Sequence, residues 1–251
     1  KNFYRGLRSI SRRIDIIGAQ LFVRPHGLLN IIPDEHEASF GVIPGRILVN
    51  GQGYSFMSEH AQVEVGPSLR NSHLFGTNIN PSEGDTILVL MPVWEKVVRY
   101  ILKVIDKVDW PIPVEVKFHP SVDRKLYEHS LSRRFSVTEK SLPELLKKAR
   151  MVVGRSSGSQ LEAAALGIPV IDVMNPSEFS HCCMPEMGRG ILWDQAINAD
   201  DVARIVHQFQ KILQEDPSRL RKEGDRIRSC YFSEPTDELI EQMLGLDKTK
   251  V

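Results

Sequence analysis

Two short polar segments follow apolar stretches in this sequence and combine residue types that bind anions: His119-Pro120 and Ser156-Ser157-Gly158. The second segment stands between an apolar stretch typical of a buried strand and an alanine-rich stretch typical of a helix. Free backbone N–H groups and the helix dipole attract phosphate at such a helix start. Because serine hydroxyls and the imidazole of His119 also donate hydrogen bonds, both segments predict contacts with a phosphate-bearing ligand.

Each of these residues also has a plain structural alternative. A serine before a helix is a common N-cap, and a histidine that ends a strand can simply pack on the following proline. Arg155 either adds a positive charge to the anion site or faces solvent. Four small residues in a row, 156–159, exceed what a cap requires, and this favours the phosphate interpretation.

The composition is that of an ordinary globular protein. The 251 residues include 41% hydrophobic and 25% charged residues, with 32 basic and 32 acidic side chains and a formal net charge of zero. This balance gives no support to binding of nucleic acid through bulk charge, so no nucleic-acid partner is expected. The arginines near the start form a local positive cluster, which is either a solvated helix face or a contact with an anionic membrane or acidic acceptor: Arg5, Arg8, Arg12 and Arg13.

The cysteines indicate a reducing compartment. There are three, Cys182, Cys183 and Cys230, which do not form a disulfide framework. No apolar run approaches the length of a membrane span and no signal peptide is recognisable, so we expect a cytoplasmic protein, with peripheral contact at the inner membrane as an option. His181 beside the vicinal cysteines lacks a fourth ligand at a supporting spacing, and there is no Asp-x-Asp element. We therefore expect neither a metal nor a cofactor.

Strands and helices alternate in the second half of the chain. The apolar patterns predict strands at 86–90, 114–118, 134–138, 151–153 and 169–173, and helices at 95–108, 143–150, 160–166 and 199–214. Two more segments follow, at 219–231 and 236–244. Ser141 and Glu144 form a capping box at the start of the helix at 143–150. This alternation predicts a parallel α/β sheet.

The first eighty or so residues alternate less regularly, with strands predicted at 16–23, 46–51 and 61–67. A polar, turn-rich segment at 77–85 is the best linker candidate. We therefore divide the chain near residue 82, into a first domain of residues 1–82 and a second of residues 83–251.

The order of these motifs resembles that of two-domain GT-B glycosyltransferases that build bacterial surface polysaccharides. His-Pro after one strand and Ser-Ser after a later one are similar to motifs of bacterial sialyltransferases, capsule Kdo transferases and CDP-glycerol polymerases. Glu162 with the following residues 163–170 is similar to a stretch of GT-B donor domains, and residues 24–27 look like a His-Gly element of their N-terminal domain. The second domain is covered almost entirely by this resemblance.

The resemblance implies an α/β fold of two Rossmann-like domains that face a cleft. Since so few residues precede the linker, the N-terminal, acceptor-side domain is expected to be incomplete. The C-terminal domain would bind the donor nucleotide through residues at the two motifs: His119, Pro120, Arg155, Ser156, Ser157, Gly158 and Glu162. The resemblance assigns His119 to a donor phosphate, where it would stabilise charge on the leaving nucleotide, and Glu162 to a ribose hydroxyl.

His26 is the candidate general base, because it follows an apolar stretch and precedes Gly27, which permits a close backbone approach. The acidic pair followed by glycine that supplies the base in the sialyltransferases is not visible here. A contact between His26 and the donor phosphate, or an ordinary loop position, remain alternatives. His26 and His119 are thus the two candidate catalytic residues.

The activity implied is metal-independent transfer of a sugar from a CMP- or CDP-linked donor to a surface glycan or glycolipid by single displacement. Three alternatives stay open. The first is transfer of glycerol phosphate from CDP-glycerol, which breaks a phosphoanhydride bond. The second is epimerisation of a sugar nucleotide, and the third is an inactive nucleotide-binding domain that regulates another enzyme.

Overall fold

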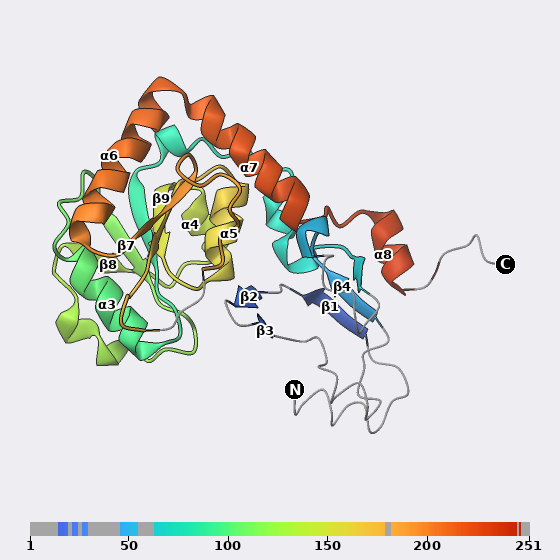
Figure 1. The fold of residues 1–251 in the computed structure, drawn as a ribbon, viewed down its shortest axis with the longest axis horizontal. Coiled ribbons are helices and arrows are strands. Elements are labelled where there is room, and N and C mark those ends of the chain that lie inside the picture. Colours follow the sequence, from blue (N-terminus) through green and yellow to red (C-terminus); the bar gives the residue numbers. More distant parts are fainter. Residues whose placement is uncertain are drawn as a thin grey trace. The chain divides into compact units, whose positions relative to one another are not determined.

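The computed structural model describes residues 15–19, 22–24, 27–29, 46–54, 63–178, 182–244 and 246. The chain forms two compact units, the first made of Lys1–Phe75 with Ser229–Val251 and the second of Gly76–Arg228 (Figure 1). These units differ from the predicted domains 1–82 and 83–251, because the residues after 228 group with the first part of the chain. That one domain binds the acceptor and the other the donor stays a prediction.

The second unit contains a six-stranded sheet in which every strand runs parallel to its neighbours. Its spatial order is β8-β7-β6-β9-β10-β11, with β6 at Thr86–Leu90, β7 at Val114–Lys117, β8 at Phe135–Val137, β9 at Ala149–Gly154, β10 at Val170–Val173 and β11 at Trp193–Ala196. The central strands are buried on both faces, as expected for apolar runs in a parallel sheet. The sequence predicts all of these strands except β11.

This strand order creates a topological switch point between β6 and β9. From β6 the chain moves outward to β7 and β8, then returns to the other side of β6 and continues through β9, β10 and β11. In open α/β sheets, ligands bind in the crevice beyond the carboxyl ends of the strands at such a point. The fold therefore marks the segments that follow β6 and β9 as the place to look for a site.

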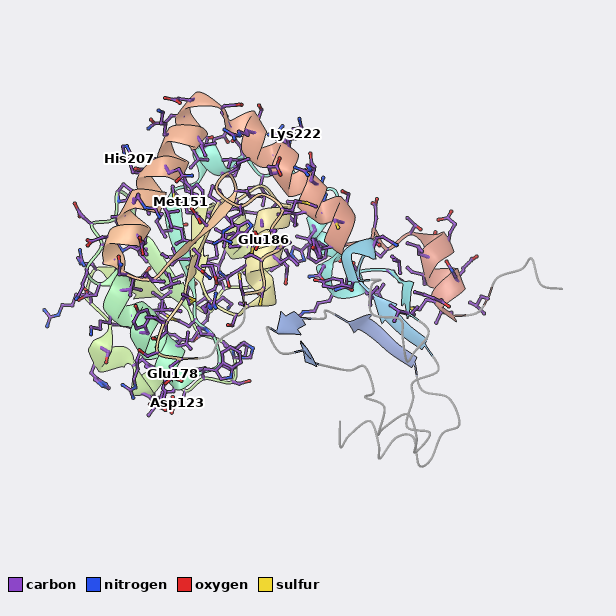
Figure 2. The ribbon with its side chains drawn as sticks, viewed as in Figure 1. Asp123, Met151, Glu178, Glu186, His207 and Lys222 are labelled. Atoms are coloured by element: carbon purple, nitrogen blue, oxygen red, sulfur yellow. The ribbon has the colours of Figure 1, made fainter. Side chains whose placement is uncertain are left out.

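Six α-helices are described: α3 (Glu95–Ile105), α4 (Leu142–Leu146), α5 (Gly158–Ala165), α6 (Ala199–Glu215), α7 (Pro217–Tyr231) and α8 (Asp237–Leu244). Short 3-10 helices lie at Gln52–Tyr54, Leu69–Leu74, Pro81–Glu83, Arg124–Leu126 and Glu128–Ser130. His207 on α6 and Lys222 on α7 are exposed, whereas Met151 is buried in β9 (Figure 2). None of the described helices is long and apolar enough to cross a membrane.

The capping box predicted for α4 is confirmed, because the Ser141 backbone N–H donates to the Glu144 carboxylate at 3.0 Å. The predicted end of this helix at residue 150 is wrong. The helix stops at Leu146, since Ala149 already pairs with Thr86 in the sheet. The apolar residues after the helix therefore belong to β9 rather than to a further helical turn.

Helix α7 packs closely against the turn that joins α5 to β10. Gly167 in this turn has φ +77°, a conformation that side chains disfavour. A Cβ on Gly224 of α7 would lie 2.6 Å from the Gly167 backbone nitrogen. Two glycines therefore allow the backbone of α7 to touch the turn.

The first unit has a parallel sheet in the order β1-β4-β5, made of Asp15–Ala19, Arg46–Val49 and Val63–Val65, and an antiparallel pair of β2 (Phe22–Arg24) and β3 (Gly27–Leu29). The single strand predicted over 16–23 is wrong, because β1 pairs with β4 while β2 pairs with β3. The strands predicted at 46–51 and 61–67 are confirmed with shorter bounds.

Residues after α7 belong to the first unit through specific contacts. The Ser68 N–H donates to the Ser233 carbonyl at 2.9 Å, and the Ser233 N–H donates back to the Ser68 hydroxyl oxygen at 3.0 Å. A Cβ on Gly51 would lie 2.4 Å from the carbonyl carbon of Tyr231. The residues that directly follow α7 therefore pack within the first unit.

Candidate functional site

The candidate site begins where β6 and β9 end side by side. Leu90 and Gly154 are partners in the register of these two strands. A Cβ at position 154 would lie 2.8 Å from the Leu90 carbonyl oxygen, so this position has no room for a side chain. The glycine lets β9 end close against β6, and the polar segment that follows emerges at the switch point.

The turn from β9 into α5 has the geometry of an anion-binding helix start. Ser156 adopts φ +55°, in the left-handed region that a non-glycine residue rarely enters. Ser157 is the N-cap, and its hydroxyl oxygen accepts from the Ser159 N–H at 3.3 Å. The Ser157 N–H donates to the side-chain oxygen of Gln160 at 3.3 Å, which completes a capping box. The helix dipole and its first N–H groups therefore point to the carboxyl edge of the sheet.

Arg155 lies inside the protein. The alternative from the sequence, that it faces solvent, is therefore wrong. Its side chain is 4% exposed and forms an ion pair with Asp172 of β10, which is fully buried. The same carboxylate accepts from the Gln160 amide at 3.4 Å and from the Gln195 amide at 3.1 Å. Burial raises the pKa of Asp172, while Arg155 and hydrogen bonds from Gln195, Cys182 and Gln160 act in the opposite direction.

Glu162 lies in the second turn of α5 and is 5% exposed. Glu162 is therefore not a solvated surface residue. The predicted contact with a ribose stays a prediction.

His119 follows β7 on an exposed loop. Its Nδ1 accepts from the Ser121 backbone N–H at 3.2 Å. Since Nδ1 is an acceptor, this hydrogen bond assigns the proton of the neutral ring to Nε2. The Nε2–H group is then a donor of the kind that a phosphate oxygen accepts, and β7 lies directly beside β6.

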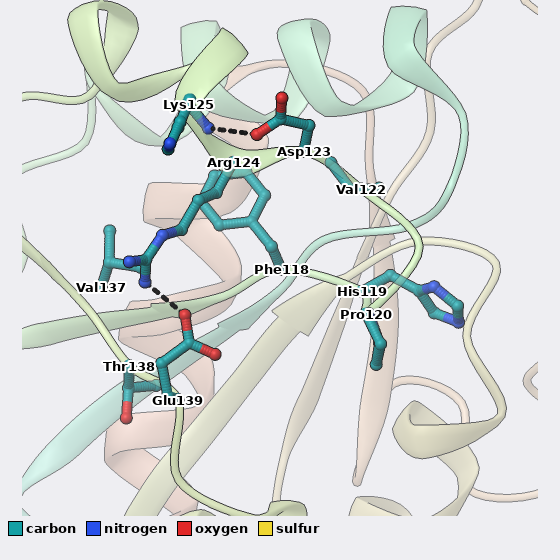
Figure 3. Close-up of a pocket in the computed structure, with 10 residues that line it drawn as sticks. All are labelled: Phe118, His119, Pro120, Val122, Asp123, Arg124, Lys125, Val137, Thr138 and Glu139. Atoms are coloured by element: carbon teal, nitrogen blue, oxygen red, sulfur yellow. Dashed lines mark hydrogen bonds and ion pairs between the residues drawn. The ribbon is translucent and has the colours of Figure 1, made fainter.

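A pocket of about 310 Å³ adjoins His119 and Pro120. It lies between the loops that follow β7 and β8, and Figure 3 shows its lining residues: Phe118, His119, Pro120, Val122, Asp123, Arg124, Lys125, Val137, Thr138 and Glu139. Arg124 and Glu139 form an ion pair across one side, and the imidazole of His119 points away from that pair (Figure 3). The pocket is therefore polar and of a size that can hold a small ring.

Other groups lie close to the carboxyl ends of the strands. Trp94, which follows β6, is 41% exposed and so is not a core residue. Lys96 at the start of α3 forms an exposed ion pair of 2.7 Å with Glu178, which follows β10. Gln160 and Asp172 are not among the site residues predicted from the sequence. The Ser-x-x-Gln spacing of a capping box was a usable signal for Gln160.

Comparison with solved structures identifies the fold of this chain. No protein-family model and no curated protein matches the chain. A variant of the wall teichoic acid polymerase TagF soaked with CDPG matches with a TM-score of 0.55 and 12% identity over 93% of this chain and 66% of that one. MnaA of S. aureus with UDP matches with a TM-score of 0.58 and 17% identity over 98% and 72%. The chain has the GT-B fold.

The predicted α/β GT-B fold is thereby confirmed, and these likenesses show the fold alone. The chain spans about two thirds of the length of the TagF structures, at 65% and 66%. Within the second GT-B unit, Ser156, Ser157 and Gly158 lie at the switch point, and His119 with Pro120 follows a strand next to it.

Several predicted residues lie outside the described part of the chain. These are His26, the candidate base, His181, and the arginines of the positive cluster: Arg5, Arg8, Arg12 and Arg13. Among the described residues, no group of three or more His, Cys, Asp or Glu side chains is arranged to hold a metal.

Proposed function

We propose that the second unit binds a nucleotide-activated donor and that the protein transfers the activated sugar, as a GT-B glycosyltransferase. The observation that carries this proposal is the position of the β9–α5 turn. It places a left-handed serine and a capped helix start directly at the switch point. A donor phosphate at this turn is favoured by the helix dipole and by N–H and hydroxyl donors.

His119 is proposed to donate from Nε2 to the donor phosphate, as its hydrogen bond with Ser121 supports. As the bond between sugar and phosphate breaks, negative charge grows on the leaving nucleotide. Fixed donors aimed at that charge lower the barrier without a metal. The pocket beside His119 is proposed to hold the nucleobase, because its volume of about 310 Å³ suits a ring of that size.

The reaction proposed is a single displacement. An acceptor hydroxyl attacks the anomeric carbon, its proton passes to a base, and the nucleotide leaves with the bonding electron pair. We assign the base to His26, on its position after an apolar stretch and before Gly27. The acceptor is proposed to be a surface glycan or glycolipid, reached by a cytoplasmic protein with peripheral contact at the inner membrane.

A cytidine donor, CMP- or CDP-linked, is favoured by the motif resemblance. The neighbouring structures were solved with CDPG in one case and with UDP in another, so they support a nucleotide and leave its base open. The likeness to a wall teichoic acid polymerase favours a second candidate, transfer of glycerol phosphate from CDP-glycerol. Product analysis separates it, because a sugar product and a glycerol phosphate product differ in phosphorus content.

Isothermal titration of the full chain with CMP, CDP, UDP and GDP tests the proposal. The His119→Ala variant should lose about 10- to 100-fold in affinity, since a hydrogen bond to a charged group is removed. His207→Ala is the matched control, because His207 is an exposed histidine on α6. No binding of any of the four nucleotides to the unchanged protein would contradict the proposed function.

A further inference from the structure

One buried carboxylate holds both ends of the β9–α5 turn. Asp172 is the β10 partner of Gly154, the last residue of β9. Arg155, the first residue of the turn, pairs with Asp172 Oδ2, and Gln160 donates to Oδ1 at 3.4 Å. Gln160 also accepts from the Ser157 N–H at 3.3 Å. The segment that would receive a phosphate is therefore tied at its start and at its helical end to the same side chain.

The turn needs such a restraint because of its backbone. Ser156 lies between the two attachment points with φ +55°. A residue in the left-handed region persists there only where the surrounding structure over-determines it. If the turn relaxed, Ser157 would no longer be held in place as the N-cap of α5.

The cluster is more polar than stability requires. Asp172 and Gln160 are fully buried, and the side chain of Arg155 is 4% exposed. Well-packed apolar residues often stabilise a protein as much as a buried ion pair does, so the pair needs another explanation. Hydrogen bonds have direction, and these fix where each end of the turn lies.

We propose that Asp172 is a positioning residue, which with Arg155 and Gln160 holds the β9–α5 turn in the shape that binds the donor phosphate. This inference rests on the proposed function and deepens it, since it assigns the charge of Arg155 to Asp172 rather than to the donor. The earlier prediction that Arg155 contacts the donor is thus replaced by an indirect role.

The test is a double variant, Arg155→Met with Asp172→Leu. It removes both charges together and leaves neither buried charge unpaired. We expect the affinity for CDP and UDP to fall by about tenfold or more. In the free protein, amide hydrogen exchange across residues 155–162 should accelerate by about tenfold and selectively, beyond any fall in the urea midpoint that comes from the acceptor lost to the Gln160 and Gln195 amides. A purely structural role would lower the midpoint without a selective change in this segment.

Gln195→Leu is the matched control. It removes a hydrogen bond of 3.1 Å to the same carboxylate, from β11, and leaves both ends of the turn attached. Its nucleotide affinity should stay within about twofold of the unchanged protein.

A folded double variant with unchanged exchange and unchanged affinity would overturn the inference. If the double variant does not fold, Gln160→Met cuts only the helical attachment and should weaken CDP and UDP binding by about threefold or more. Unchanged binding by that variant would also overturn it. If the unchanged protein binds neither nucleotide, the proposed function fails first, and hydrogen exchange alone then decides whether the cluster holds the turn.

Discussion

Ser156 is the single non-glycine residue with positive φ among those that the structure describes. Its neighbours explain how this conformation is kept, because the residue before it is anchored in a buried ion pair and the residue after it caps a helix. Unusual backbone conformations of this kind often occur at binding sites. The residue therefore offers a test of the turn that does not depend on knowing the donor.

Ser156→Gly should change the free energy of unfolding by little, or raise it by up to about 1 kcal/mol, because glycine adopts positive φ without a steric penalty. Ser159→Gly is the matched control, since Ser159 lies inside the first turn of α5. There glycine should lower stability by about 0.5–1 kcal/mol. Urea unfolding of both variants measures the difference, and an equal loss in both would contradict the assigned conformation.

The cysteine pair at 182–183 belongs to the surroundings of the same cluster. Burial and the nearby Asp172 carboxylate raise the pKa of the Cys182 thiol to about 12, and burial also raises the pKa of Cys183. Since the thiolate is the reactive form, both cysteines are expected to be inert in the folded protein.

Alkylation with iodoacetamide at pH 8, followed by peptide mass spectrometry, measures this. Cys182 should react about a hundredfold or more slowly in the folded protein than in guanidinium chloride. A raised thiol pKa also means that the folded state keeps a proton that the unfolded state releases above pH 9 or so. Stability should therefore fall as pH rises from about 9 toward 12. Equal alkylation in both states would contradict the raised pKa of Cys182.

At the scale of elements, the sequence predicts what depends on continuous apolar runs. Strands β6, β9 and β10 are such runs, and all three are found where expected. Strand β11 was not predicted, because Asp194 and Gln195 interrupt its apolar pattern. Gln195 donates to Asp172 of the neighbouring strand β10, and this partner can be identified only when the pairing of the two strands is known.

Some residues of the candidate site could be predicted from local sequence motifs, and others depend on contacts between distant segments. The spacing of local motifs indicated the serine turn and His119, since a strand end and a helix start can be recognised within a few residues. The ion pair between Arg155 and Asp172 could not be predicted, because it depends on the pairing of β9 with β10. The pocket beside His119 depends likewise on two loops that are separate in the sequence.

That pocket gives a prediction for the loops after β7 and β8. Val137 is 38% exposed and lines the pocket, so Val137→Trp should fill it without disturbing the core. The variant should bind CDP about tenfold more weakly but bind pyrophosphate as before, because the proposed base contact is blocked and the phosphate contact is not. Leu126→Trp, at another exposed apolar position, is the control. If the variant lost the same affinity for CDP and for pyrophosphate, the proposal that this pocket holds the nucleobase would be contradicted.

At the scale of the whole molecule, the two units have unequal shares in the proposed chemistry. The second unit has its own six-stranded sheet and supplies the serine turn, His119 and the pocket. The first unit includes the segment that follows α7 and contains the candidate base, His26. Donor binding and transfer should therefore be separable.

A fragment of residues 76–228 tests this separation. We expect it to fold, because its sheet and core are complete within it, and to bind CDP or UDP within about tenfold of the full chain. It should release no nucleotide from a donor in the presence of acceptor, since the proposed base lies in the other unit. Circular dichroism and titration on the fragment and the full chain measure both properties. A folded fragment that binds no nucleotide, beside a full chain that does, would show that the first unit supplies essential donor contacts.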